Sequence, residues 1–95
     1  MFVEPAALKE GWERDRIMDA INGRGVPCFS GVCPEIYFEK AFDHTGWLPA
    51  ERLPVARELG ETALMFLVHP TLEQEHIDKS CKVLRDVMKE ALLPD

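Results

Sequence analysis

Residues 63–93 read ALMFLVHPTLEQEHIDKSCKVLRDVMKEALL, and this stretch decides the fold class. It opens with six consecutive apolar residues, the pattern of a strand that is buried on both faces, and we expect this strand to be the central one. His69 and Pro70 end the strand, and Thr71 with Gln74 forms a capping-box pattern. The helix that follows, expected over Leu72–Leu92, has one apolar stripe: Ile77, Cys81, Leu84, Met88 and Ala91.

Upstream, the sequence predicts a second amphipathic helix and two more strands. The helix is expected over Trp12–Asn22, because apolar residues recur there at helical spacing, and glycines follow it. The strands are expected near Phe2 and at Val26–Ser30. Residues 1–95 therefore predict a single α+β domain, with a small, mainly antiparallel sheet covered by amphipathic helices.

The middle of the chain is expected to be mostly connection. Pro34 suits the first turn of a short helix over Glu35–Phe42, and Pro54 suits the start of another that Gly60 stops. The chain begins with an apparent strand end at Phe2 and Val3, so we expect it to be a severed domain.

Composition excludes several classes of function. The 11 basic and 17 acidic side chains give a formal charge of −6, which disfavours nucleic acid and anionic membranes. The longest apolar run, residues 63–68, is too short to span a bilayer, and no secretory signal is present, so we expect a cytoplasmic protein. The three cysteines are expected to be reduced thiols, and a zinc site built from Cys28, Cys33 and His69 has only a weak spacing signal, so we expect no metal.

Residues 29–37, FSGVCPEIY, are the segment that a structural role explains least well. Small residues and one tyrosine leave room for a ligand where a strand passes into a helix, and backbone N–H groups there could hold an oxygen anion. A tight turn that needs Gly31 and Pro34 explains the same residues. Two alternatives are likewise open for His69: it faces a ligand, or it hydrogen-bonds the end of a strand or helix. For Trp12 and Trp47 the alternatives are a partner surface and a cover for the edge of the core.

Several motifs together resemble the C-terminal part of the DegT/DnrJ/StrS aminotransferases, over nearly the whole chain. They are Arg14–Ile17, Gly25–Pro27, Cys33–Phe42, Leu53–Ala56 and Leu67–Leu72. The resemblance implies the small domain of a fold-type I enzyme that uses pyridoxal phosphate to aminate nucleotide-linked keto sugars for cell-surface polysaccharide or antibiotic pathways. It also implies that the cofactor and its lysine belong to a large N-terminal domain absent from residues 1–95.

The resemblance places six residues toward the substrate: Ser30, Gly31, Cys33, Glu35, Tyr37 and His69. Many members have a tyrosine-proline-histidine pattern in this place, whereas this chain has Gly31-Val32-Cys33-Pro34-Glu35. The expected partner is the large domain of the same enzyme, and a homodimer is a further option. The isolated chain is expected to be inactive and to bind no pyridoxal phosphate. The rival hypotheses are a free-standing binding or interaction module and, more remotely, a thiol enzyme that uses Cys33 with His69.

Overall fold

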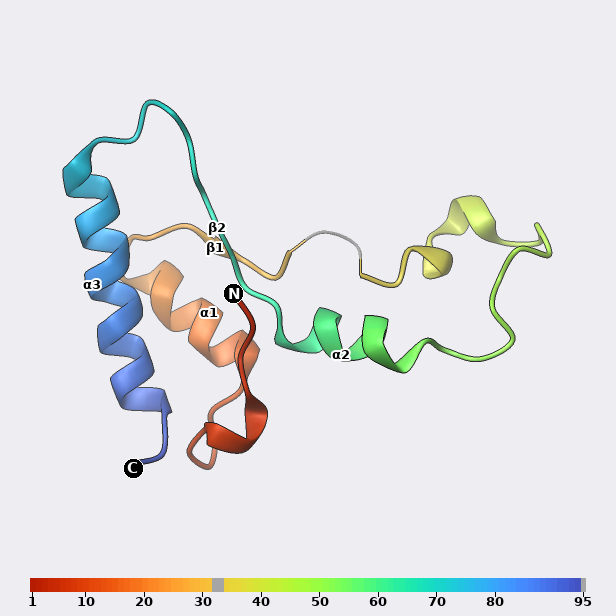
Figure 1. The fold of residues 1–95 in the computed structure, drawn as a ribbon, viewed down its shortest axis with the longest axis horizontal. Coiled ribbons are helices and arrows are strands. Elements are labelled where there is room, and N and C mark those ends of the chain that lie inside the picture. Colours follow the sequence, from red (N-terminus) through yellow and green to blue (C-terminus); the bar gives the residue numbers. More distant parts are fainter. Residues whose placement is uncertain (32–33, 95) are drawn as a thin grey trace.

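The computed structural model of the chain describes residues 1–31 and 34–94 (Figure 1). Three α-helices are formed within these residues: α1 (Arg14–Gly23), α2 (Pro54–Thr62) and α3 (Gln74–Ala91). The two strands are β1 (Cys28–Phe29) and β2 (Met65–Phe66). Three short 3₁₀ turns complete the chain: η1 (Pro5–Ala7), η2 (Ile36–Phe38) and η3 (Lys40–Phe42).

The strands confirm the predicted small antiparallel sheet and the α+β class. β1 pairs with β2 in antiparallel register, with Cys28 opposite Phe66 and Phe29 opposite Met65. On its other side the β2 segment meets the N-terminus through an antiparallel bridge between Phe2 and Ala63. Residues 63–66 therefore lie in the middle of the three segments, as the apolar run predicted, although the ladders are only one or two residues long.

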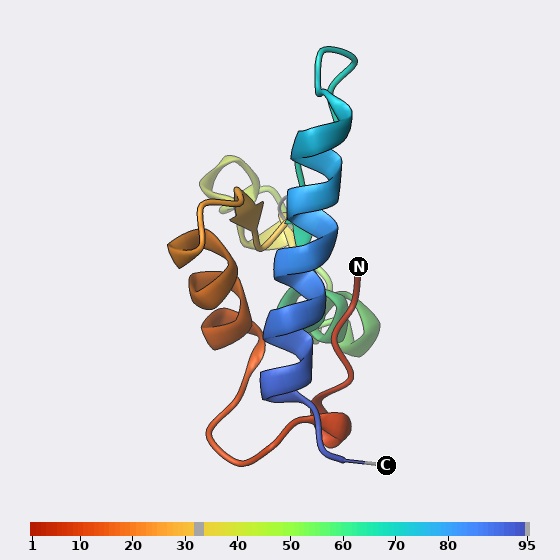
Figure 2. The same cartoon turned by 90° about the vertical axis from the view of Figure 1, so that its left-hand side faces the viewer.

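α1 and α3 cover one face of these strands, as Figure 2 shows from the helix side. The apolar stripe of α1 is buried at Ile17 and Ile21, where it meets Val87 and Ala91 of α3. Cys28 of β1 and its neighbours complete the cluster: Val3, Leu8, Val26 and Leu64. Most of the chain's hydrophobic stabilisation therefore comes from one small core between two helices and the strands.

The other face of the strands carries no layer among the described residues, so the expectation of a strand buried on both faces is wrong. Leu64 is only 2 % exposed, whereas Met65, Leu67 and Val68 are exposed, Val68 to 94 %. Because successive side chains of a strand point to opposite faces, Phe29 and its cross-strand partner Met65 share the uncovered face.

α3 begins two residues later than expected, and its predicted capping box is also wrong. Glu73 is the N-cap, and its backbone N–H donates to Nδ1 of His76 at 3.1 Å. Thr71 instead bonds to His69 in the preceding turn.

The predicted stripe of α3 is core only in its C-terminal half. Leu84, Met88 and Ala91 pack in or against the cluster, with Val87 added, but Ile77 and Cys81 are exposed. The N-terminal half of α3 projects beyond the rest of the molecule (Figure 2).

The expectation that Gly60 stops the second short helix is wrong, because α2 continues to Thr62. A Cβ atom at Gly60 would lie 2.5 Å from Cγ of Pro34, so glycine is needed here for a close approach of two segments. Arg14 fixes the end of α2 to the body, because its Nη1 donates to the carbonyls of Gly60 at 2.7 Å and Ala63 at 3.0 Å.

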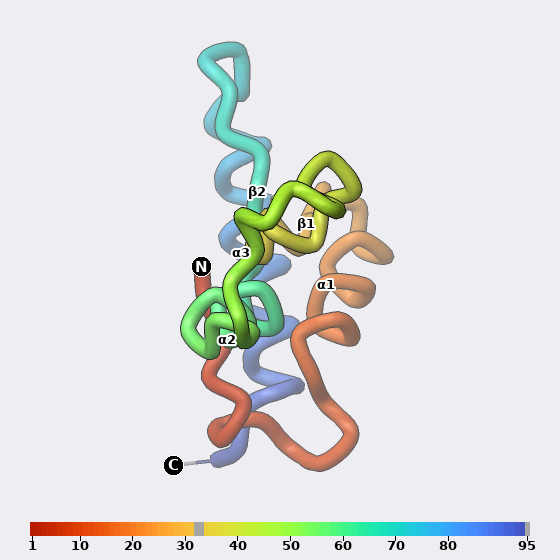
Figure 3. The backbone as a smooth tube through the Cα atoms, turned by 90° about the vertical axis from the view of Figure 1, so that its right-hand side faces the viewer, coloured from red at the N-terminus to blue at the C-terminus, as the bar shows by residue number. Residues whose placement is uncertain are grey.

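The helix expected over Glu35–Phe42 forms only η2 and η3, and residues 34–53 extend as an arm. Figure 3, viewed from the side opposite to Figure 2, shows the arm and α2 in front of the helical body. The Cα radius of gyration is 16.3 Å, whereas a compact domain of this length has about 12 Å. No helix in the described residues is both long and apolar enough to cross a membrane.

Candidate functional site

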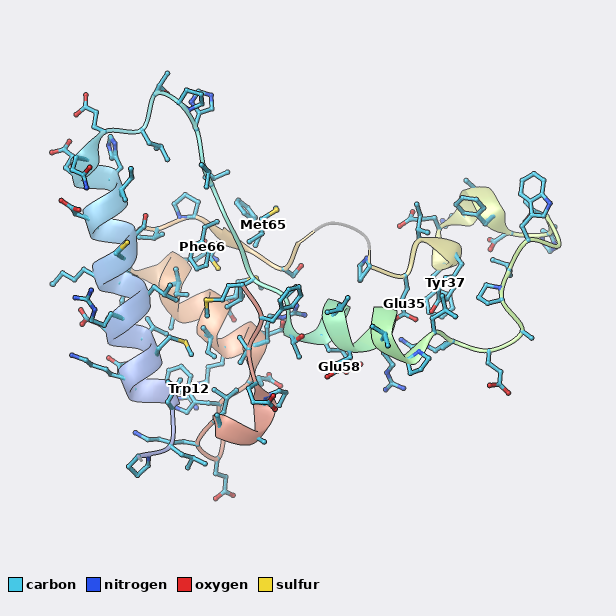
Figure 4. All side chains as sticks on the ribbon, in the orientation of Figure 1. Trp12, Glu35, Tyr37, Glu58, Met65 and Phe66 are labelled. Carbon is cyan, nitrogen blue, oxygen red and sulfur yellow. The ribbon has the colours of Figure 1, made fainter. Side chains whose placement is uncertain are left out.

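Two of the six predicted site residues, Glu35 and Tyr37, meet at the base of the arm, as Figure 4 shows. The phenol of Tyr37 donates to Oε2 of Glu35 at 2.6 Å. Arg52, near the C-terminal end of the arm in the sequence, binds the same carboxylate. Its Nη2 lies 2.6 Å from Oε1 and its Nε lies 2.9 Å from Oε2. This is a bidentate, charge-assisted ion pair, which is stronger and more specific in geometry than a hydrogen bond between neutral groups.

Further contacts join the same residues to the chain that follows. The backbone N–H of Leu53 donates to the Tyr37 oxygen at 3.0 Å. The ring of Phe38 lies edge-on to that of Tyr37, with centroids 4.8 Å apart, and the Arg52 guanidinium lies 5.2 Å from the Phe38 centroid. We call Glu35, Tyr37, Phe38 and Arg52 the arm-base cluster.

The arm-base cluster changes the acid–base properties of its members. Hydrogen bonds from Arg52 and then from Tyr37 lower the pKa of Glu35 from 4.5 to about 2. Desolvation, followed by the hydrogen bond to Glu35, raises the pKa of Tyr37, and the bond to Glu35 raises the pKa of Arg52. At neutral pH the cluster therefore holds one carboxylate, one guanidinium and one neutral phenol. A group this strongly ionised is a poor general acid or base at neutral pH.

Two further predicted site residues, Ser30 and Gly31, directly follow β1 and precede the arm in the sequence. Ser30 is exposed, and Gly31 has a φ of 94°, a left-handed conformation that favours glycine. This φ is the backbone angle that the turn interpretation requires of Gly31, and the ligand interpretation of the segment stays a prediction. Cys33 lies outside the described residues.

The structure does not bring His69 to the arm-base cluster. It lies in the turn before α3, at the opposite end of the molecule from the arm (Figure 1). Its Nδ1 accepts the backbone N–H of Thr71 at 3.2 Å and lies 2.7 Å from that residue's hydroxyl. These bonds stabilise the turn before α3, as the structural alternative for His69 expects, and the ligand alternative stays a prediction.

His69 also borders a groove of about 590 Å³ between the projecting half of α3 and the end of the β2 segment. The walls of the groove are mainly apolar, from Val26, Phe66, Leu72 and Ile77. Lys79 and the exposed thiol of Cys81 border it as well.

The described residues offer no metal centre and no attachment point for pyridoxal phosphate. No group of three or more His, Cys, Asp or Glu side chains in residues 1–31 and 34–94 is arranged to hold a metal ion. Burial raises the pKa of the Cys28 thiol, which disfavours the thiolate that binds metal. A lysine that holds this cofactor needs a partly desolvated pocket, whereas all five lysines are exposed: Lys9, Lys40, Lys79, Lys82 and Lys89. These residues do not fit the cofactor.

Sequence reasoning missed Arg52, which pairs with a carboxylate 17 positions away. No periodicity links the two residues, because the intervening segment is neither helix nor strand for most of its length. Glu35 and Tyr37 belong to the segment 29–37 that the sequence singled out as a ligand site, and that ligand role stays a prediction. Their contact with Arg52 is visible only in the tertiary structure.

Comparison with known proteins gives one informative similarity. No family model matches the sequence. No curated protein matches it either. Among solved structures, the aminotransferase from Psychrobacter cryohalolentis is similar over 94 % of this chain, with 52 % sequence identity and a TM-score of 0.89. The match spans only 22 % of that enzyme's chain, so this protein is similar in sequence and in fold to a domain-sized part of an aminotransferase.

Proposed function

We propose that this chain is the C-terminal small domain of a pyridoxal-phosphate-dependent aminotransferase of the DegT/DnrJ/StrS family. The proposed reaction is amination of a nucleotide-linked keto sugar in the cytoplasm, for cell-surface polysaccharide or a related product. The observation that carries the proposal is the 52 % identity, over 94 % of the chain, to part of an aminotransferase.

In this proposal the chemistry belongs to a large domain outside residues 1–95. The cofactor supplies the electron sink that allows an amino group to move between carbon skeletons. This chain has no desolvated lysine to hold it, since all five lysines are exposed. Its contribution is to pack on the large domain and to close part of the substrate pocket with residues 30–37.

Two features support such a docking role. The strand face around Phe29 and Met65 is apolar and uncovered, and the arm extends away from the core. Both leave apolar surface in water, which in a monomeric soluble domain often marks an interaction site. A partner of the size implied by the comparison would cover this surface.

A chimaera tests the proposal directly. The segment of the Psychrobacter cryohalolentis aminotransferase that matches this chain is replaced by residues 1–95, and transamination is assayed with a nucleotide-linked keto sugar. We expect the chimaera to retain the cofactor and to be active. The matched controls are the unaltered enzyme and the enzyme without the segment, which we expect to be inactive.

A chimaera that retains the cofactor but transaminates no nucleotide-linked sugar would reject the substrate class. A chimaera in which the chain folds without contacting the rest would instead favour the free-standing module. The isolated 95-residue chain is assayed in the same way as the chimaera. Pyridoxal phosphate absorbance that survives dialysis of this chain would contradict the assignment of cofactor binding to the large domain.

A further inference from the structure

The arm between the two ends of the arm-base cluster has the properties of a preformed loop. Its ends, Glu35 and Arg52, are joined by two hydrogen bonds of 2.6 and 2.9 Å, and Tyr37 adds a bond of 3.0 Å from Leu53. Sixteen residues lie between the ends, which is within the range of compact Ω-loops, and such loops are frequently functional.

The hydrogen-bonding capacity of Glu35 and Tyr37 is largely used inside this loop. Both carboxylate oxygens of Glu35 accept bonds, and its side chain is only 12 % exposed. Tyr37 donates its hydroxyl proton to Glu35 and accepts a backbone N–H. A substrate could bind these atoms only by displacing Arg52 or Leu53, so their contacts indicate a positioning role.

The far part of the loop is also preorganised, around Trp47. The hydroxyl of Thr45 donates to the carbonyl of Phe42 at 2.7 Å and accepts the backbone N–H of Trp47 at 3.2 Å. His44 and Gly46 have positive φ angles, 63° and 76°, which turn the chain sharply on either side of Thr45. The turn therefore fixes the backbone at Trp47, while the side chain of this residue is 79 % exposed.

An exposed tryptophan on a fixed loop has the character of an interface anchor. Tryptophan is enriched among the residues that dominate binding energy, and a preformed loop reduces the entropy lost on docking. The comparison supplies a candidate partner, because the matched segment is only 22 % of the similar enzyme and most of that enzyme lies outside the match.

We propose that Glu35, Tyr37 and Arg52 are positioning residues that hold the loop, and that Trp47 docks into an apolar pocket on the large domain of the same protein. This inference rests on the proposed function for the identity of the partner. The internal geometry of the loop does not depend on it.

The positioning role is tested in the 95-residue chain by hydrogen–deuterium exchange of peptides that cover residues 36–53. Glu35→Arg and Arg52→Glu each place two like charges at the base, so we expect faster exchange in the arm but not in α1 or α3. The double variant E35R/R52E restores opposite charges, and we expect it to restore slow exchange. Single variants that leave the arm unchanged, or a double variant without rescue, would overturn the positioning role.

The docking role is tested by the same measurement in the chimaera. We expect exchange in the arm to be slower than in the 95-residue chain, on the order of tenfold, and Trp47→Ala to abolish the difference. Val68→Ala is the matched control, because Val68 is 94 % exposed at the other end of the molecule. An unprotected arm, or protection that survives Trp47→Ala, would overturn the docking role. Transaminase activity of the chimaera decides the proposed function separately.

Discussion

Gly60 lies inside α2, where alanine would ordinarily stabilise the helix by about 1 kcal/mol. A Cβ atom there would lie 2.5 Å from Cγ and 2.9 Å from Cβ of Pro34, and a proline ring cannot rotate away. We therefore predict that Gly60→Ala displaces Pro34 and lowers the free energy of unfolding by about 1–3 kcal/mol, the range for overpacked sites. Urea denaturation measures the loss, and the amide shift of Leu53 reports on the arm base.

Gly23→Ala is the matched control, because a Cβ added at this last residue of α1 meets nothing within 4 Å beyond its chain neighbours and its own helix backbone. We expect it to leave stability unchanged or to raise it by up to about 1 kcal/mol. Equal effects of the two substitutions would show that the Pro34 contact is unimportant.

Glu35 gives the chain a specific acid sensitivity. Because its pKa falls from 4.5 to about 2 on folding, its ion pair stabilises the protein fully above pH 4.5. This stabilisation decreases as the pH falls and is lost below about pH 2. We predict that Glu35→Gln destabilises the chain near neutral pH and that its stability differs little from wild type at pH 2. Urea unfolding of both proteins as a function of pH checks this, and a difference that does not depend on pH would contradict it.

At the scale of the elements, α1 and the two halves of α3 contribute unequally to stability. Ile17 of α1 is 0 % exposed, whereas Ile77 in the projecting half of α3 is 45 % exposed. We predict that Ile17→Ala lowers the free energy of unfolding by about 2–5 kcal/mol, through lost apolar burial and a residual cavity.

The same substitution at Ile77 is the chemical control, and we expect it to cost less than about 1 kcal/mol. Thermal or urea denaturation of both variants makes the comparison. If Ile77→Ala costs as much as Ile17→Ala, the projecting half of α3 is packed in solution, and the groove beside it is closed.

At the scale of the whole molecule, we expect the uncovered strand face to mediate self-association of the 95-residue chain. Phe2, Phe29 and Met65 are exposed there, and the short β1 and β2 leave unpaired edges. We predict weak association of the 95-residue chain, seen as a sedimentation coefficient that rises with protein concentration. The double variant Phe29→Thr with Met65→Thr should reduce this rise, because it removes apolar surface and keeps residues suited to strands.

Leu93→Thr is the control for that experiment, since Leu93 is an exposed apolar residue outside the strand face. We expect it to associate like the wild type. A wild-type chain that stays monomeric at all concentrations would contradict the prediction.

The sequence by itself determined the elements whose signals are local. The apolar run at 63–68 predicted the middle strand, the spacing of Ile17 and Ile21 predicted α1, and Pro54 predicted the start of α2. These predictions succeeded because the side-chain period of a helix or strand, and the backbone preference of proline, depend only on residues that are close in the sequence. The ligand role that the composition of residues 29–37 suggests stays a prediction.

Only the tertiary structure decided which predicted surfaces are buried and which charges meet. The apolar run at 63–68 does not reveal that one of its two faces is exposed. Whether a face is buried depends on elements elsewhere in the chain or outside it. Gly60 does not end α2, and it instead leaves space for the ring of Pro34. No local sequence pattern predicts that contact, because the two residues are far apart in the sequence. The Glu35–Arg52 pair arises for the same reason: an irregular arm brings together residues that no helix or strand period relates.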